Sequence, residues 1–278
     1  MRKTRLPLLC MLAIGCAGAL AVCHTPAARA ETIDIPLNKV TYIDGAYNEN
    51  LGAQSTIKNV VNAADHAGIT AGTATRSLLG MPSVTVPVGE QIESVSLNLW
   101  CTQYNTNGAA TPFSMVLYPL TTGFVEGTGT KGQGSLSGAT WNTYDGTDPW
   151  VTPGGGGDFD STLPVLASAV PGINAWTTFD LTNLWKNTNL QTHGAELTVS
   201  PENPTLVPAG TWVTESFASN DWVNSPGTNY NPYLAVTLAP VPEPSAAALL
   251  AAGVSLAAIG FGRRLRSTRQ SCLSPRKS

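Results

Sequence analysis

The sequence predicts an all-β fold, a jelly-roll-type β-sandwich formed by a single domain over residues 31–240. Three observations predict it. Short segments alternate apolar and polar residues, as half-buried strands do. Clusters of Gly, Pro, Asn and Asp separate these segments, and helical periodicity is nearly absent. The domain is also long enough to bury one sizeable core.

The clearest strand covers residues 95–101. Its alternation places the side chains from Val95 to Cys101 in steps of two on one face and directs Trp100 to the other. The other segments with strict alternation are 195–199 and 233–238. Weaker strand candidates are 40–43, 56–61, 76–79, 84–88, 113–118, 176–180 and 211–217.

Two segments depart from the strand pattern. Residues 182–186 have helical spacing, with Thr182 as a possible N-cap and Trp185 directed into the core. Residues 123–161 form a long glycine-rich loop, and a loop of that length in a compact domain is usually functional or disordered. Its aromatic residues favour an ordered loop.

Residues 1–30 have the layout of a secretory signal peptide. Arg2, Lys3 and Arg5 precede an apolar stretch from 6 to 22, and an A-x-A cleavage site follows at Ala28 and Ala30. Cleavage there would leave Glu31 as the first residue of the exported chain. The alternatives are a first transmembrane helix, which the cleavage site argues against, and a lipoprotein. Neither possible lipidation cysteine, Cys16 or Cys23, has the pattern that lipidation requires.

The C-terminal part carries a second apolar segment. Val241-Pro242-Glu243-Pro244 precedes the apolar run 245–262, and Arg263, Arg264 and Arg266 follow it. As a helix the run would span about 27 Å, just enough for the hydrocarbon core of a membrane. The arginines would mark the cytoplasmic side, so residues 267–278 form a predicted cytoplasmic tail and the domain lies outside.

The order of motifs in residues 241–266 resembles the PEP-CTERM sorting signal of Gram-negative bacteria that make exopolysaccharide. The resemblance implies an exosortase-type membrane protease that cuts near Pro-Glu-Pro and releases or re-anchors the protein. It also implies export across the inner membrane to the cell surface or the medium. The alternative is a simple tail anchor.

Charge and cysteine content exclude several kinds of partner and site. Residues 31–240 contain five basic and 17 acidic residues, a formal charge of −12. This charge argues against nucleic acid as a partner. It also repels polyanions unless Ca²⁺ bridges the negative charges or salt screens them. Cys101 is the only cysteine in that range, so an intramolecular disulfide is excluded there. With His66 and His193 it gives no zinc-ligand spacing.

A second resemblance extends over nearly all of residues 40–238. Tyr42-Ile43-Asp44 with residues 48–52 resembles the opening of the DNRLRE domain, an extracellular β-sandwich family related to carbohydrate-binding modules. Further segments that match the family in order are 76–79, 95–100, 125–129, 138–142, 150–155, 179–185, 217–219 and 232–234. The chain departs from the family at Gly80-Met81, Phe124 and Asn220-Asp221.

Seven tryptophans and seven tyrosines suggest a ligand that binds by stacking. Sugar rings have apolar faces that lie against aromatic rings, while polar side chains bind their hydroxyl groups. The candidate ligand-binding residues are Trp100, Trp141, Trp150, Trp212, Trp222 and Tyr230. The structural alternative is that the long loop covers Trp100 and that Trp141 and Trp150 anchor the loop.

Four loop aspartates are candidate Ca²⁺ ligands, because this cation prefers carboxylate and carbonyl oxygens. They are Asp145, Asp148, Asp158 and Asp160. The alternative is that they are solvated carboxylates that keep the protein soluble. Nothing in the sequence fixes two carboxylates as a glycosidase pair, and a nucleophile motif is absent, so we expect no enzymatic activity.

Together these observations predict a non-catalytic protein of the extracellular matrix that binds polysaccharide, with neutral glycans favoured. The alternatives are a structural biofilm protein without a specific ligand and a polysaccharide-processing enzyme. A binding protein would expose its loop tryptophans, a structural protein would bury them, and an enzyme would bring two carboxylates together in a groove.

Overall fold

The computed structural model describes residues 30–62, 74–107, 114–134, 137–167, 172–200 and 212–241. The chain divides into Met1–Ala239 and Pro240–Ser278, and the fold described below is that of the first unit. The predicted processing residues Ala28, Pro242, Glu243, Pro244, Arg263 and Arg264 lie outside the described residues. Among the residues that are described, no helix is long and apolar enough to cross a membrane.

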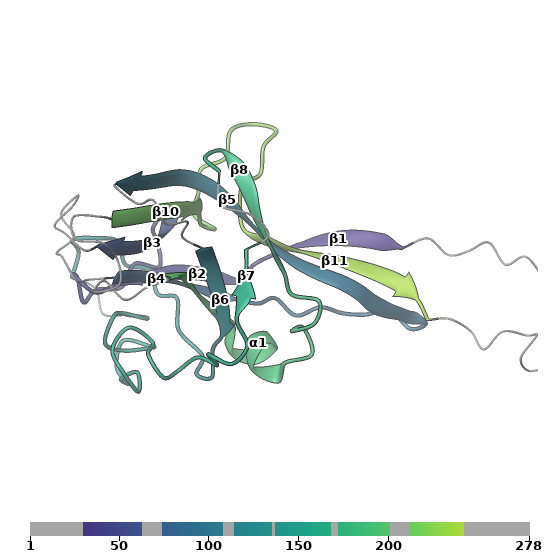
Figure 1. The fold of residues 1–278 in the computed structure, drawn as a ribbon, viewed down its shortest axis with the longest axis horizontal. Helices are drawn as coiled ribbons and strands as arrows, with labels where there is room; N and C mark the ends of the chain where they lie inside the picture. The colour runs from purple at the N-terminus through teal and green to yellow at the C-terminus, as the bar shows by residue number, and fades with distance from the viewer. Residues whose placement is uncertain are drawn as a thin grey trace, which may run out of the picture. The chain divides into compact units, whose positions relative to one another are not determined.

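The all-β class predicted from the sequence is confirmed, and the strands form a curled antiparallel sheet (Figure 1). Its strand order is β1-β11-β5-β10-β3-β4-β9-β6-β7, while β2 pairs with β4 and β8 with β5. The described elements are β1 (Glu31–Pro36), β2 (Lys39–Asp44), β3 (Thr56–Asn62), β4 (Ala74–Gly80), β5 (Glu90–Asn107), β6 (Ser114–Pro119), β7 (Val165–Leu166), β8 (Ala175–Asp180), α1 (Thr188–His193), β9 (Ala195–Ser200), β10 (Trp212–Ala218) and β11 (Tyr233–Pro240).

Most predicted strands are present, but residues 84–88 are not a strand. Its valines alternate, yet Pro87 within the segment and Pro82 just before it lack the N–H that a ladder needs. It turns into β5 through a hydrogen bond from the Glu90 amide to the Pro87 carbonyl, 3.1 Å. β1 and the short β7 were not predicted.

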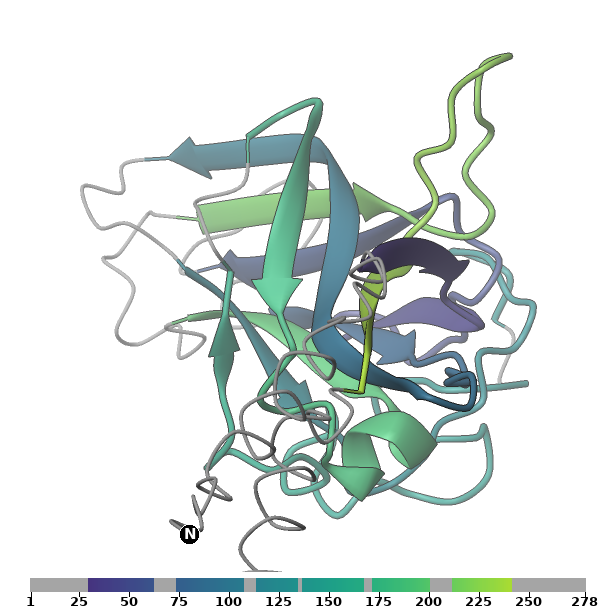
Figure 2. The same cartoon turned by 90° about the vertical axis from the view of Figure 1, so that its right-hand side faces the viewer.

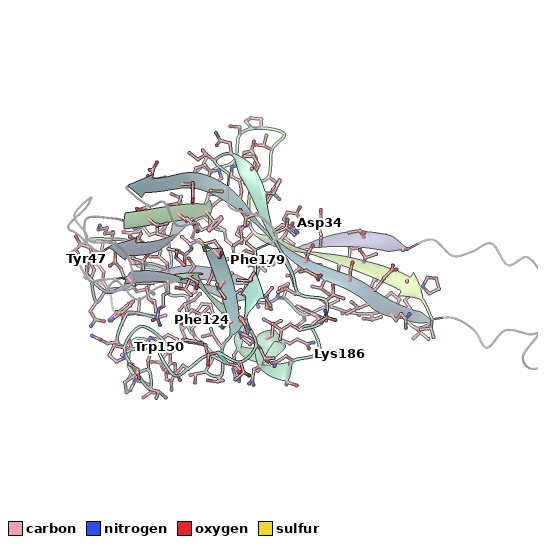
Figure 3. The ribbon with its side chains drawn as sticks, in the orientation of Figure 1. Asp34, Tyr47, Phe124, Trp150, Phe179 and Lys186 are labelled. Atoms are coloured by element: carbon pink, nitrogen blue, oxygen red, sulfur yellow. The ribbon has the colours of Figure 1, made fainter. Side chains whose placement is uncertain are left out.

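The main core lies inside the curl of the sheet (Figure 2). On β5 the side chains of Val95, Leu97, Leu99 and Cys101 are fully buried, as their alternation predicted. Phe179 from β8 joins them in the interior (Figure 3). Burying each large apolar side chain contributes about 1.5–3 kcal/mol, so this cluster dominates the stability of the fold.

A smaller core forms where the glycine-rich loop packs on the outer face of the sheet. Phe124 and Trp150 from the loop pack with Ile43 of β2 and Leu78 of β4. Asn50 ties the loop to the β2–β3 connection, since its side-chain amide donates to the carbonyl of Glu126 at 2.6 Å. The loop is therefore an ordered layer over the sheet across its described residues.

The segment after β8 differs in detail from the prediction. The Thr182 hydroxyl does not cap a helix but accepts a hydrogen bond from the Val95 amide, 3.1 Å. The cap of this turn is Asp180, whose carboxylate accepts the Thr182 amide at 2.9 Å. Trp185 is buried as expected, and the helix α1 begins one turn later, after its N-cap Asn187.

Candidate functional site

Four aromatic side chains from distant parts of the chain meet on the outside of the sheet. They are Trp100 (β5), Trp176 (β8), Tyr230 (the loop before β11) and Tyr233 (β11), and we call them the aromatic surface. Trp100 and Tyr230 stack with centroids 4.3 Å apart, and Trp176 meets Trp100 edge-on at 5.4 Å. Tyr233 meets Trp176 at 5.1 Å. Trp176 is 37% exposed and the other three are half-buried.

Strand register explains the central pair. On β5 Trp100 lies between Leu99 and Cys101, whose side chains enter the core, so its own ring points outward. Trp176 is its direct partner in the antiparallel β5–β8 pairing. Aromatic side chains on opposing positions of neighbouring strands stabilise each other by about 0.2–1 kcal/mol.

Asparagine side chains hold the loop that carries Tyr230. The backbone amide of Tyr230 donates to the side-chain oxygen of Asn224 at 2.7 Å, and the side-chain amide of Asn224 donates to the side-chain oxygen of Asn231 at 2.9 Å. The side-chain amide of Asn220 donates to the Leu37 carbonyl at 3.1 Å, which ties the loop to the β1–β2 connection. Because the loop is held before any ligand arrives, ordering it costs little on binding.

A row of polar side chains continues the aromatic surface along β5 and β8. Ser96 and Asn98 share the outward face of β5 with Trp100, and Thr178 and Asp180 share that of β8 with Trp176. The Thr178 hydroxyl donates to the Asn98 side chain at 2.9 Å. At about 3.3 Å per residue the row extends about 13 Å from the rings, which is longer than a single sugar residue.

Two aspartates lie beside these rings and this row. Asp34 of β1 pairs with Ala235 and so shares a sheet face with Tyr233. Burial, with the nearby Asp34 carboxylate, raises the pKa of Tyr233. At the end of the row, hydrogen bonds from Thr182 lower the pKa of Asp180.

The structure separates the six predicted ligand-binding residues. Trp100 and Tyr230 come together, whereas Trp150 is 3% exposed and its ring N–H donates to the Thr140 carbonyl at 3.0 Å. Trp141 is half-buried, 5.6 Å from the Arg76 guanidinium, and packs near Gly154. A buried ring has no face for a ligand, so Trp150 anchors the loop, and we leave it out of the binding set.

The remaining two candidates contribute less. Trp222 is half-buried in the loop that carries Tyr230. Trp212 begins β10, and its side chain lies outside the described part of the structure.

Sequence analysis missed Trp176 and Tyr233. Both begin segments that were predicted as strands, so their outward direction was available from the pattern. Their place beside Trp100 depends on which strands lie next to β5. These neighbours are β8 and β11, which are far from β5 in the sequence, so the local pattern does not predict the contact.

The four predicted calcium ligands each hold their own part of the glycine-rich loop. Asp145 accepts the amides of Thr147 and Asp148, both at 2.7 Å, which lowers its pKa. Asp158 accepts the Thr122 hydroxyl at 2.8 Å and the Val151 amide at 2.6 Å. Asp148 accepts the Tyr144 hydroxyl, and Asp160 accepts the amide of Thr162.

Nothing in the described ranges groups three or more His, Cys, Asp or Glu side chains as a metal site would require. Calcium at the four loop aspartates stays a prediction, to be tested by chelation.

Within the described part of the chain, Glu196 and Glu215 are fully buried, and they face opposite sides of the sheet. Glu215 points into the main core between Val213 and Phe217, and burial raises its pKa to about 8. Neither of its carboxylate oxygens has a hydrogen-bond partner within the described residues. Glu196 lies on the outer face under the glycine-rich loop, 3.3 Å from Arg76. The two carboxylates therefore do not converge on a common groove.

A separate cleft of about 710 Å³ opens between residues 82–86, the start of β5 and the turn into α1. Val84, Ile92 and Trp185 form part of its apolar wall, and Lys186 is the basic residue of its lining. In Figure 3, Lys186 lies well away from Asp34, which is on the same sheet face as Tyr233 of the aromatic surface. Sequence analysis did not find this cleft, because it assigned residues 84–88 to a strand.

Comparison with known proteins gives no family for this chain: no protein-family model matches it, and no curated protein matches it. The resemblances to the DNRLRE domain and to PEP-CTERM signals therefore depend on the sequence motifs described above.

Proposed function

We propose that this protein is an exported, non-catalytic module that binds polysaccharide through the aromatic surface. The observation that carries the proposal is the cluster of Trp100, Trp176, Tyr230 and Tyr233, which is partly exposed and held by the asparagines of the neighbouring loop. An apolar sugar face would lie on these rings.

The polar row beside the rings supplies the second half of the mechanism. Thr178 and Asp180 would bind sugar hydroxyl groups along the same face, and the buried Asn98 holds the Thr178 hydroxyl. Hydrogen bonds of this kind fix orientation and specificity, while burial of ring surface supplies most of the affinity. A glycan chain lying along β5 and β8 would use both.

The proposal includes the wider architecture and the route to the cell surface. We infer a jelly-roll-type sandwich of the DNRLRE kind, with a signal peptide at residues 1–30 removed on export. The C-terminal segment would be recognised and cut by an exosortase-type protease near Pro242-Glu243-Pro244. The domain would then act at the cell surface or in the exopolysaccharide matrix of a Gram-negative bacterium.

A binding role accounts for the site better than a catalytic role does. Glycosidases need two carboxyl groups that face one another across the scissile bond. The buried Glu196 and Glu215 face opposite sides of the sheet, and Asp158 is held by loop hydrogen bonds.

A structural matrix protein is the second candidate, and a specific observation favours it. Trp150 and Trp141 hold the glycine-rich loop on the sheet, so part of the aromatic content serves the fold. In a purely structural protein, the aromatic surface would bind no ligand.

Binding of the purified protein to a panel of neutral polysaccharides tests the proposal, with and without a calcium chelator. Trp176→Ala removes the most exposed ring, and we expect affinity to fall by about 10-fold, corresponding to about 1.4 kcal/mol. Trp141→Ala is the matched control in the glycine-rich loop and should keep wild-type affinity. No binding across the panel by the folded protein would favour the structural matrix protein instead.

A further inference from the structure

We propose that the aromatic surface is selective for polysaccharides of amino sugars whose amines are protonated. This inference rests on the proposed function and adds the charge of the ligand, which the stacking argument alone leaves open.

Carboxylates lie on both sides of the aromatic surface. Asp34 shares a sheet face with Tyr233 and is close enough to act on its hydroxyl group. Asp180 is exposed at the far end of the polar row, four residues along β8 from Trp176. A glycan that lies on the rings and along the polar row would therefore pass one carboxylate on the β1 side and another on β8.

The positive charges of the domain are held elsewhere. Residues 31–240 contain five basic residues, all in the described ranges: Lys39, Lys58, Arg76, Lys131 and Lys186. The cation–ring contacts seen in those ranges involve Phe124, Trp141 and Tyr47, and none involves a ring of the aromatic surface. The surface thus combines aromatic faces with carboxylates, and no Lys or Arg side chain of the described residues lies over its rings to repel an ammonium group.

Two physical effects favour a cationic sugar at such a surface. An ammonium group over a tryptophan or tyrosine ring at an exposed site raises affinity by about two- to five-fold. Each exposed ammonium–carboxylate pair adds about 0.2–1 kcal/mol, or up to about five-fold in affinity. The formal charge of −12 adds a long-range attraction for any polycation.

The same charges direct a polyanion to a different place. Lys186 lines the cleft near α1, and it has no carboxylate within ion-pair distance among the residues whose positions are described. An acidic polysaccharide would therefore favour that cleft over the aromatic surface.

Three hexasaccharides with the same β-1,4 backbone provide the test, because they differ only at carbon 2. They are the hexamers of glucosamine, N-acetylglucosamine and glucose, which carry an ammonium, an acetamido and a hydroxyl group there. Affinities are measured with the purified protein at about pH 5.5, where the amines of the glucosamine hexamer are protonated. We expect the glucosamine hexamer to bind at least about 10-fold tighter than the glucose hexamer, with the preference weakened in salt of about 0.5 M.

Variants locate the effect. Asp34→Asn and Asp180→Asn should each reduce the preference for glucosamine over glucose by about three-fold. Asp34→Asn should also leave the affinity for the glucose hexamer unchanged, because Asp34 lies outside the polar row. Asn keeps the oxygen that accepts the Thr182 amide, so the turn after β8 is preserved. Asp148→Asn removes an exposed charge from the glycine-rich loop and serves as the control.

The possible results separate this inference from the proposed function. Equal affinity for the three hexamers overturns the inference while the proposed function stands. A glucosamine preference that survives in the Asp34→Asn, Asp180→Asn double variant also overturns it, because the charge effect then lies elsewhere. Tighter binding of a polyuronate, abolished by Lys186→Gln, overturns it in favour of the cleft. No binding of any of these glycans contradicts the proposed function, and the inference fails with it.

Discussion

The protein has two aromatic-rich regions, and they use their rings in opposite ways. In the glycine-rich loop, Trp150 is buried and its ring N–H is satisfied by a backbone carbonyl, so the ring stabilises the loop. On the aromatic surface, Trp176 keeps more than a third of its area exposed although it packs edge-on against Trp100. Aromatic content alone therefore does not locate a binding site; the exposure of the rings does.

The largest effect that we expect is a dependence of folding stability on pH, and it comes from the interior rather than from the aromatic surface. Glu215 has a pKa of about 8 when folded, against an ordinary value of 4.5, because it is buried. The folded state therefore keeps a proton that the unfolded state releases, and stability falls as pH rises from about 4.5 to about 8. The loss amounts to as much as about 5 kcal/mol from this group.

Chemical unfolding at several pH values measures this effect in the wild type and in Glu215→Gln. In the variant, the unfolding free energy should fall much less between about pH 5 and pH 8 than it does in the wild type. Cys101 and Tyr104 on β5 face Glu215, but their raised pKa values place their titration at higher pH. An equal slope in the two proteins would show that Glu215 is not the group responsible.

The next effect concerns the glycine-rich loop. Trp150→Ala should cost about 3–5 kcal/mol in unfolding free energy, because it removes a buried aromatic ring and leaves a cavity under the loop. Glycan affinity of the folded fraction should not change. A loss of affinity without a loss of stability would reverse the roles we assign to the two regions.

A smaller effect tests the preorganisation of the aromatic surface. Asn224→Ala removes the acceptor of the Tyr230 amide, and we expect a loss in glycan affinity of about three-fold to 10-fold. Titration calorimetry should attribute the loss to a less favourable entropy, since the loop must then be ordered on binding. The control is Asn229→Ala in the same loop, and it should have a smaller effect because its side chain accepts the Asn231 amide and, at 3.5 Å, the Asn224 side-chain amide, but not the amide of Tyr230. Equal losses in both variants would argue against a specific role for Asn224.

Much of the fold followed from local patterns. Alternation from Val95 to Cys101 predicted both the buried face of β5 and the outward direction of Trp100. The same rule failed at residues 84–88, where valines alternate but Pro87 within the segment and Pro82 before it cannot donate to a strand ladder. Local pattern predicts a strand only where the backbone can pair.

The candidate site was harder to predict, because it depends on which strands become neighbours. Trp100 and Trp176 lie 76 positions apart in the sequence, and only the β5–β8 register brings them together. Glu215 lies between Val213 and Phe217 on one face of β10, so alternation indicates an apolar face but gives no reason for a carboxylate there. Long-range pairing fixes the first of these facts.

Oxidative footprinting of the tryptophans during glycan binding tests the central claim most directly. The claim predicts that saturating glucosamine hexamer protects Trp176 from oxidation and leaves the reactivity of Trp141 unchanged. Binding that protects Trp141 while Trp176 stays reactive would place the ligand on the glycine-rich loop and contradict the account.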